Sequence, residues 1–594
     1  MSALRQALDD LKDNPEQWEA YQQRGHCAVL APPGSGKTKL LTTKAVWLAN
    51  NLLGPSQGLA CVTLTNAAAN ELRTRIRALG QPVGHAVSVG TVHSFVMSHI
   101  IRPFSAPAGH PEWAGYTLAP RQVARDAMIH AINLAFPAGA DTRYVASTIS
   151  RNRKMCLTDE EWQTAGPFMR DAAEAFERLL RQQNYIDFDG AVRVAVDLVE
   201  QHPFVQTVLN ARFPYLMIDE YQDLAPGLHR IVSALSIDEG KSTLFAVGDP
   251  DQAIFGFTGT RPELLLELAD RSDVHRVDLR INYRCGAVIA QAAQRILGTD
   301  VQPHTMRGGG AVTVQYEPNG LTAQADYIAE RIRALCAEGA QLREIAVLAP
   351  QNDDCAAIVE VLRGHGIPAS WNTGAYDSSP LTIVIEAFAA WAACGREDCG
   401  HHLGDLLDQW QHLGDWDAFR AATDGIVDLL LHTTTGSNAA VFVEAIATAI
   451  DASALSSTLR DDDAAAFTRM RAALADGGAM AGYTVEQLGR LRLRDGRVEV
   501  SSMTSSKGLE FDHVFIAAVE QGRLPYYSSG YQTVAWLEDR RKFYVSFTRA
   551  RESVAVVYSG WYLAPFGVKR DGPSVFLFES GLLARPGRQT PPDC

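Results

Sequence analysis

The chain has 594 residues, of which 46% are hydrophobic and 21% charged, so we expect several folded domains rather than a disordered protein. A net charge of −14 argues against a uniformly basic coat for nucleic acid but leaves room for a local basic channel. No apolar run approaches the ~20 residues of a membrane-spanning helix, and nine scattered cysteines without a secretory signal indicate the cytoplasm.

Ahead of the first strand, Asn14 and Pro15 have the pattern of a helix start, with Asn14 as N-cap and Pro15 in the first helical position. Gln17 follows on the same helix, just upstream of an apolar strand. A side-chain amide both donates and accepts, so Gln17 is a candidate reader of an adenine edge; the alternative is an ordinary surface glutamine.

Residues 31–38 read Ala-Pro-Pro-Gly-Ser-Gly-Lys-Thr, between a short apolar strand and a helical pattern. Gly34 and Gly36 let backbone N–H groups converge on phosphate oxygens at the helix N-terminus. Lys37 supplies a positive charge for the outer phosphates, and the Thr38 hydroxyl is a ligand for Mg²⁺. The pattern predicts ATP and Mg²⁺ as cofactors, bound by Pro33, Gly34, Ser35, Gly36, Lys37 and Thr38.

Further strands end in polar side chains, at the edge where parallel sheets bind ligands. The apolar strand before Asp219 and Glu220 places two acids beside the phosphate-binding loop. Asp219 is the candidate Mg²⁺ ligand, and Glu220 the candidate base that orients and deprotonates the attacking water. Gln252, after the next strand, is a candidate sensor of the γ-phosphate. A pair of structural surface acids is the alternative interpretation of Asp219 and Glu220.

Aromatic and basic residues complete the pattern. Phe255 and Phe257 are either core anchors or platforms on which bases stack. Tyr283 can lie on a purine ring and Arg284 can reach a phosphate. A helix over residues 538–550 is expected to bury Phe543, Tyr544 and Phe547 and to expose Arg549 near its end. Arg284 and Arg549 then complete a split nucleotide site in the manner of arginine fingers.

A short segment groups two cysteines and two histidines, Cys394, Cys399, His401 and His402. Zinc uses such ligands, but four of them within nine residues are cramped for a tetrahedral site, so metal binding here stays open.

The ordered set of motifs resembles the UvrD/Rep/PcrA group of superfamily 1 helicases, from Gln17 to about residue 558. The resemblance implies two RecA-like domains with parallel sheets, each interrupted by a helical insertion, and ATP-driven 3′-to-5′ translocation on single-stranded DNA with duplex unwinding. It rests on Gln17, APPGSGKT, TLTNAAANEL, GTVHSF, IDEYQD, VGDPDQAIFGFTGT, NYR, SSKGLEF and YVSFTRARE.

With that fold, the chain order gives the domain boundaries. The first RecA-like domain is expected over 1–95 and 187–280, interrupted by a helical insertion over 96–186. The second RecA-like domain is expected over 281–378 and 485–565, and it contains a linker at 300–310. Its compact helical insertion covers 379–484, and a tail covers 566–594.

The resemblance also implies residue roles. Gln17 matches the adenine reader, Lys39 the basic residue beside the base, Tyr283 the stacking tyrosine and Glu510 the contact to ribose. Gln252, Arg284 and Arg549 match the γ-phosphate sensors, and Lys37 and Glu220 the other catalytic residues. The implied DNA contacts are Thr65, Asn66, His93, Phe255, Phe257 and Thr504; without the resemblance, His93 would be taken as a buried structural histidine.

The chain departs from the family pattern at several positions that concern DNA grip. Leu64 replaces an aromatic residue, Phe257 a tryptophan, Thr258 an arginine and Thr504 a histidine, and Pro350 stands where a strand-end arginine is common. The hydrolytic residues are intact, so ATP hydrolysis is the safer expectation and processive unwinding the bolder one.

Residues 95–104 also resemble the helicase-like subunit of Gabija antiphage systems, which pairs with an ATPase-nuclease of the OLD type. Two function classes therefore stand. One is a motor that translocates on DNA and unwinds it, as in DNA repair. The other is a DNA-gated ATPase that regulates a partner nuclease of OLD type in antiviral defence, with little unwinding of its own.

Overall fold

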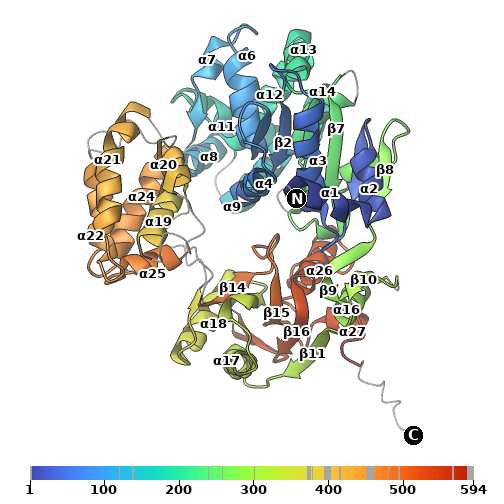
Figure 1. The fold of residues 1–594 in the computed structure, drawn as a ribbon, viewed down its shortest axis with the longest axis vertical. Coiled ribbons are helices and arrows are strands. Elements are labelled where there is room, and N and C mark those ends of the chain that lie inside the picture. The colour runs from blue at the N-terminus through green and yellow to red at the C-terminus, as the bar shows by residue number, and fades with distance from the viewer. Residues whose placement is uncertain are drawn as a thin grey trace. The chain divides into compact units, whose positions relative to one another are not determined.

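The structure is a computed structural model that describes residues 3–119, 121–136, 140–237, 240–256, 259–299, 301–370, 376, 379–393, 403–411, 413, 416–449, 461–478, 480–491, 496–564 and 567–584. It divides into two compact units, whose elements are labelled in Figure 1. Unit 1 comprises Met1–Leu118, Gln122–Pro318 and Met503–Cys594, and unit 2 comprises Ala119–Arg121 and Asn319–Ser502.

Unit 1 contains a parallel sheet of six strands in the order β3-β2-β6-β7-β1-β8. Since the strands are parallel, the polar residues that follow them lie along one edge of the sheet. The strands are β1 (Cys27–Leu30), β2 (Leu59–Thr63), β3 (Val87–Thr91), β6 (Tyr215–Ile218), β7 (Thr243–Gly248) and β8 (His275–Asp278).

Helices cover both faces of this sheet. Successive side chains of a strand point to opposite faces, so an apolar strand presents apolar side chains to the helices on each side. On β1, Cys27 and Val29 pack into one core with helices α1–α4, whereas Ala28 and Leu30 pack into a second core with later helices. The first face carries α1 (Ala3–Lys12), α2 (Pro15–Gln22), α3 (Lys37–Asn51) and α4 (Asn66–Ala78); the second carries α5 (Val92–Phe95), α12 (Phe188–Gln201), α13 (Pro203–Arg212), α14 (Pro226–Ser236) and α15 (Glu263–Ala269).

The segment between β3 and α12 is mainly helical, as expected. It also contains one short parallel pair of strands, β4 (Thr117–Leu118) and β5 (Tyr185–Ile186), that the sequence pattern did not predict. A two-residue strand carries too little alternation to be recognised from sequence. The helices are the π-helical stretch η1 (Val96–Ile101), α6 (Arg102–Phe104), α7 (Pro111–Ala114), α8 (Arg121–Ala135), α9 (Thr142–Lys154), α10 (Asp159–Ala165) and α11 (Pro167–Arg181).

A second set of parallel strands in unit 1 consists of β11 (Ala311–Tyr316), β16 (Ala550–Tyr558) and β15 (Phe511–Ile516), in that order. Helices α16 (Ala287–Leu297) and α26 (Val534–Phe547) pack together beside these strands. The expected linker at 300–310 is in part wrong, because β10 (His304–Arg307) pairs in parallel with β9 (Ile281–Gly286). Among the described residues, unit 1 further contains η2 (Tyr221–Asp223), η3 (Pro250–Gln252), the antiparallel pair β17 (Tyr562–Ala564) and β18 (Gly567–Lys569), and α27 (Val575–Glu579).

Unit 2 combines a parallel ladder with a helical group. In the ladder, β14 (Val498–Ser502) lies between β12 (Ile345–Ala349) and β13 (Ala369–Ser370), with α17 (Leu321–Ala337), η5 (Leu342–Glu344) and α18 (Asn352–Gly364). The helical group, visible in Figure 1, has its own apolar core. It comprises α19 (Pro380–Ala393), α20 (Leu403–Gln411), α21 (Trp416–His432), α22 (Ala439–Ala449), α24 (Asp461–Leu474) and α25 (Val485–Arg490).

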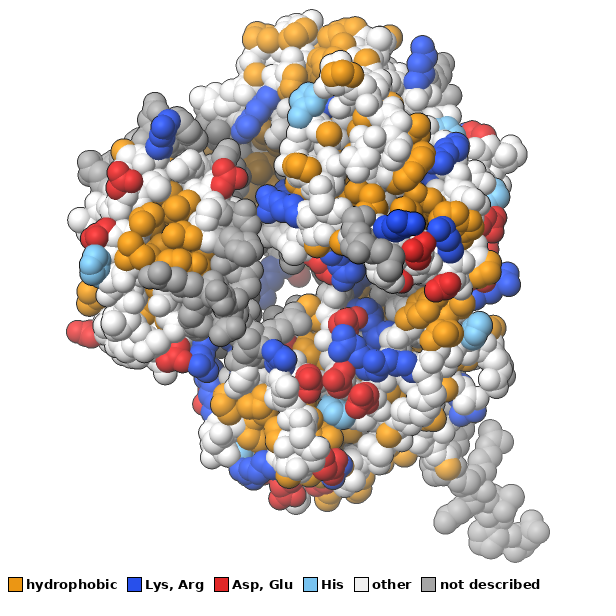
Figure 2. All heavy atoms as spheres, viewed as in Figure 1, with side chains coloured by type: hydrophobic (Ala, Val, Ile, Leu, Met, Phe, Trp, Pro, Cys, Tyr) orange, Lys and Arg blue, Asp and Glu red, His pale blue; other side chains and the backbone are white. Residues whose placement is uncertain are grey.

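The expected fold class is confirmed: the protein is α/β, with two RecA-like domains, parallel sheets and mainly helical insertions. No helix among the described residues is long and apolar enough to cross a bilayer. On the face drawn in Figure 2, lysine and arginine side chains are interspersed with acidic ones, so the acidic net charge does not make this face uniformly negative.

Candidate active site

The phosphate-binding loop joins β1 to α3 as the sequence predicts. Gly34 and Gly36 have φ angles of +73° and +81°, a backbone region that L side chains rarely adopt. A Cβ atom on Gly34 would lie 2.5 Å from Asn282 Oδ1, and one on Gly36 would lie 2.6 Å from Gln17 Nε2. The loop therefore requires glycine twice, for its turn and for the close approach of its neighbours.

Replacing Gly36 with alanine is expected to weaken ATP binding about tenfold, because strain of roughly 1–2 kcal/mol at a positive φ adds to the clash with Gln17. Titration of a fluorescent ATP analogue measures the loss. Gly25→Ala is the matched control, since no atom lies within 4 Å of a Cβ placed on Gly25. Equal affinity of the two variants would show that Gly36 is not part of the nucleotide site.

Lys37 and Glu220 form the central ion pair of the site. Lys37 is the first residue of α3, and its Nζ lies 2.6 Å from Glu220 Oε1. Glu220 follows β6 with a φ of +55°, an unusual backbone conformation for a residue other than glycine and one often found at functional sites. Burial favours the neutral form of Glu220, but Lys37 and Lys507 outweigh burial and hold its pKa well below its usual range. Glu220 is therefore ionised at neutral pH.

Asp219 lies directly before Glu220 and is only 6% exposed. Burial and the neighbouring Glu220 carboxylate raise the pKa of Asp219 to about 7. Its Oδ1 atom is buried and forms no hydrogen bond. Asp219 directly follows β6 and interacts electrostatically with Lys37 of the phosphate-binding loop. A buried carboxylate oxygen without a donor at this place has the chemistry that Mg²⁺ requires of a ligand, so the residues present fit this ion.

A chain of hydrogen bonds connects Glu220 to the end of the next strand. Gln222 Nε2 donates to Glu220 Oε2 at 2.5 Å, and Gln222 Oε1 accepts from the backbone N–H of Asp249 at 2.9 Å. Gln252 Nε2 in turn donates to Asp249 Oδ2 at 2.6 Å. The predicted catalytic base and the predicted γ-phosphate sensor therefore belong to one network, which Gln222 and Asp249 complete.

Arg549 contradicts the expectation of an exposed arginine at the end of its helix, because it is only 2% exposed. Its guanidinium donates to the carbonyl oxygens of Val545 and Leu509 at 3.0 and 3.1 Å, and to Gln252 Oε1 at 3.1 Å. Burial and the positive charge of Arg284 lower the pKa of Arg549 to about 9. The side chain turns inward to Gln252, so the structure brings these two predicted γ-phosphate sensors together.

Tyr283 and Arg284 lie on β9, which passes beside the phosphate-binding loop: the N–H of Tyr283 donates to the carbonyl oxygen of Gly34 at 2.8 Å. Arg284 Nε donates to Glu510 Oε2 at 2.9 Å, and Glu510 also pairs with Arg551 at 2.5 Å. Burial opposes the ionised form of Glu510, but the two arginines outweigh burial and lower its pKa.

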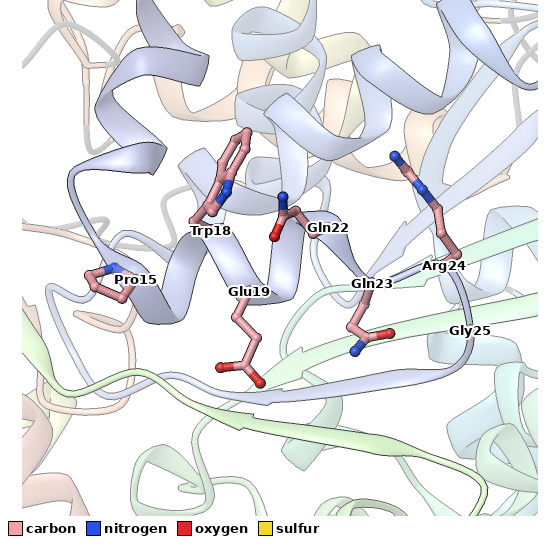
Figure 3. Close-up of a pocket in the computed structure, with 7 residues that line it drawn as sticks. All are labelled: Pro15, Trp18, Glu19, Gln22, Gln23, Arg24 and Gly25. Atoms are coloured by element: carbon pink, nitrogen blue, oxygen red, sulfur yellow. The ribbon is translucent and has the colours of Figure 1, made fainter.

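Gln17 lies on the buried side of α2, 3% exposed, where its Nε2 donates to the carbonyl oxygen of Ser35 at 2.7 Å. Gln17 therefore lies beside the loop, and the alternative of an ordinary surface glutamine is wrong, while its role as the reader of an adenine edge stays a prediction. The opposite side of α2 and the turn after it line a surface hollow, shown in Figure 3 with its lining residues Pro15, Trp18, Glu19, Gln22, Gln23, Arg24 and Gly25. Lys39, the basic residue expected beside the base, pairs with Asp10 at 2.5 Å.

Lys507 is a residue of this region to which the sequence reasoning gave no role. Its Nζ pairs with Asp223, lies 3.9 Å from Glu220 Oε2 and donates to the carbonyl oxygen of Gln252 at 2.8 Å. The same Nζ lies 5.3 Å from the ring centroid of Phe255. The signal was present, since Lys507 stands in the SSKGLEF motif, but its partners lie more than 250 positions away in sequence.

The predicted DNA contacts are only partly brought together. Phe255 and Thr504 both meet Lys507, whose N–H donates to the carbonyl oxygen of Thr504 at 3.4 Å. Thr65 instead caps α4, accepting from the N–H of Ala68 at 3.1 Å. His93 packs against a different element, with its ring centroid 4.5 Å from that of Phe188 on α12.

Burial and the nearby Lys154 lower the pKa of His93 to about 4, so this half-buried histidine is neutral at pH 7. Several other predicted positions lie outside the described residues: Phe257, Thr258, the side chain of Asn66, and the segment with Cys394, Cys399, His401 and His402. Among the residues that are described, no group of three histidine, cysteine or acidic side chains has the arrangement of a metal site.

Two family models match this chain. The UvrD/REP helicase N-terminal domain matches residues 13–273, which include the phosphate-binding loop, Glu220 and Gln252, and the UvrD-like helicase C-terminal domain matches residues 453–560, which include Lys507 and Arg549. Together the two matches cover well over half of the chain. The protein therefore belongs to the UvrD-like helicases of superfamily 1.

Individual relatives agree with this family. The ATP-dependent DNA helicase UvrD2 of Mycobacterium tuberculosis (strain ATCC 25618 / H37Rv) is 28% identical over 604 residues, covering 95% of this chain and 81% of the relative. The ATP-dependent DNA helicase PcrA of Leuconostoc citreum is 29% identical over 337 residues, covering 54% and 44%. The putative ATP-dependent DNA helicase YjcD of Bacillus subtilis (strain 168) is 26% identical over 416 residues, covering 66% and 53%.

Proposed function

We propose that this protein is an ATP-dependent DNA helicase that translocates 3′ to 5′ on single-stranded DNA in the cytoplasm and couples ATP hydrolysis to duplex unwinding. The observation that carries the proposal is the convergence, within unit 1, of the Lys37–Glu220 pair, the Gln252–Arg549 contact and Arg284 around one phosphate-binding loop. The family and its named relatives support DNA as the substrate and ATP hydrolysis as the energy source.

Lys37 and Glu220 have complementary roles in this proposal. Lys37 is paired with Glu220 at 2.6 Å, and its ammonium is also the group that would bind the outer phosphates of ATP. With Lys37 bound to phosphate, the Glu220 carboxylate would be available to orient water and accept its proton. Thr38 and Asp219 are the residues that would hold Mg²⁺, which neutralises charge on the phosphates when bound.

Arg284 and Arg549 supply the charge opposite the loop. Both guanidinium groups are held by acceptors: Arg284 by Glu510 and the Thr548 carbonyl, Arg549 by Gln252 and two carbonyls. Such fixed donors stabilise charge that develops on the γ-phosphate during transfer. Gln252 is hydrogen-bonded to both Arg549 and Asp249. A γ-phosphate bound at Arg549 would therefore also act on the segment after β7, which leads to Phe255.

Single-stranded DNA is proposed to contact Thr65, Asn66, His93, Phe255, Phe257 and Thr504. Phe255 is half-buried and lies against Lys507, so an aromatic face and a positive charge occur together, as in other single-strand-binding proteins. Because Lys507 also contacts Gln252 and Asp223, a strand bound at Phe255 would act on the groups that surround Glu220. This contact is the proposed link between DNA binding and hydrolysis.

The test is ATP hydrolysis with and without a 3′-tailed duplex, with strand separation followed in the same reaction. We expect DNA to stimulate hydrolysis, strands to separate, and a 5′-tailed duplex to remain paired. Separation of only the 5′-tailed duplex would contradict the polarity. Absence of ATP hydrolysis under all conditions would overturn the proposed function.

A second candidate function rests on Leu64, which replaces a base-stacking aromatic in the family pattern. Leu64 is a partly buried side chain packed against the apolar core of unit 1, which offers no aromatic face to a base. A weaker DNA grip favours a DNA-gated ATPase that signals to a partner nuclease of OLD type. In the assay above, that function gives DNA-stimulated hydrolysis without strand separation.

A further inference from the structure

Helix α2 is held at its C-terminal end by the helix that follows the phosphate-binding loop. Lys44 of α3 is 4% exposed, and its Nζ donates to the carbonyl oxygens of Ala20, Tyr21 and Gln23 at 2.9, 3.0 and 2.6 Å. These are carbonyls that a helix end leaves without intrahelical partners. The other end of α2 begins at its N-cap, Asn14, three residues before Gln17.

Asn14 occupies that N-terminus and is completely buried. Its Oδ1 accepts from the N–H groups of Glu16 and Gln17, both at 3.0 Å, which caps α2. Its Nδ2 points the other way and donates to the hydroxyl of Tyr283 at 3.0 Å, across 269 positions of sequence. One side chain thus bonds both to the helix that carries Gln17 and to the hydroxyl of Tyr283.

We propose that Asn14 is a positioning residue for nucleotide recognition, which fixes the Tyr283 ring relative to Gln17 so that a purine base fits between them. This inference rests on the proposed function, in which Gln17 and Tyr283 contact the base. The Tyr283 side chain is 39% exposed while its hydroxyl is held by Asn14, so the ring has free area for stacking and a fixed orientation. An aromatic ring that is already oriented loses less conformational freedom when a base stacks on it.

Three variants separate capping from the contact with Tyr283. Asn14→Ser keeps a good N-cap but is too short to reach the tyrosine hydroxyl. Asn14→Asp keeps the cap and can accept a hydrogen bond from that hydroxyl. Tyr283→Phe keeps the ring and removes the hydroxyl alone. Affinities for the non-hydrolysable imido analogues of ATP and CTP, together with the melting temperature, are measured for each variant and for the double variant Asn14→Ser/Tyr283→Phe.

We expect Asn14→Ser and Tyr283→Phe each to weaken binding of the ATP analogue about three- to tenfold, the effect of one lost hydrogen bond. The double variant should be no weaker than either single variant, and Asn14→Asp should stay within about twofold of the original protein by the same measure. Binding of the CTP analogue should change less, because a pyrimidine offers a smaller stacking surface.

Unchanged affinity in both single variants would overturn the inference, as would additive losses in the double variant. A lower melting temperature in Asn14→Ser without any change in affinity would also overturn it, since Asn14 would then be only a helix cap. Because these are binding measurements, they remain decisive if the original protein fails to hydrolyse ATP, a result that would overturn the proposed function instead.

Discussion

Glu220→Gln is expected to lower the turnover number for ATP by about 10²- to 10⁴-fold, the usual contribution of a general base. Glutamine keeps the size of the side chain and the oxygen that accepts from Gln222, but it cannot take a proton from water. It also removes the anion that holds Lys37 at 2.6 Å, so Lys37 becomes more available to phosphate. ATP should therefore bind at least as tightly as before while hydrolysis nearly stops.

Steady-state hydrolysis of ATP measures turnover, and equilibrium binding of the non-hydrolysable imido analogue of ATP measures affinity. Glu200→Gln is the matched control: Glu200 is a partly exposed partner of Arg230 on the surface, and the same chemical change there should leave both quantities unaltered. Turnover within tenfold of the original protein would show that Glu220 is not the base. A parallel loss of binding and turnover would assign Glu220 a structural role around Lys37.

The sequence was most informative where local pattern and local chemistry coincide. The phosphate-binding loop needs two glycines for its own backbone and a helix directly after it, and both are visible within eight residues. The same holds for the capped start of α2 at Asn14 and for the strand that ends at Ile218, directly before Asp219. These features arise from neighbours in sequence, so composition and spacing predict them.

Contacts that close over long sequence distances were not predictable. Helical spacing places Arg549 at the end of α26, but its burial depends on Leu509 and Gln252, which come from other parts of the chain. The pair of Lys507 with Asp223 and the bond between Asn14 and Tyr283 are of the same kind. In each case the partner is chosen by the packing of the fold, which a single sequence does not display.

Arg549→Lys is expected to reduce the turnover number about 10³-fold or more, the range found for the loss of an arginine finger. A lysine ammonium keeps the charge but cannot reach the Val545 and Leu509 carbonyls and Gln252 Oε1 together from the fixed fork of a guanidinium. Burial and Arg284 lower the pKa of Arg549 to about 9, which shows that its charge is costly here and that a nearby phosphate anion would be favourable.

The side chain is nearly completely buried, so lost turnover has to be separated from lost folding. Circular dichroism melting and binding of the ATP analogue serve that purpose: a catalytic role predicts a folded protein that binds ATP within about tenfold of the original. Arg230→Lys, at a partly exposed arginine paired with Glu200, is the matched control and should leave turnover unchanged. A folded Arg549→Lys variant with near-normal turnover would remove Arg549 from the hydrolytic site and leave Arg284 as the candidate finger.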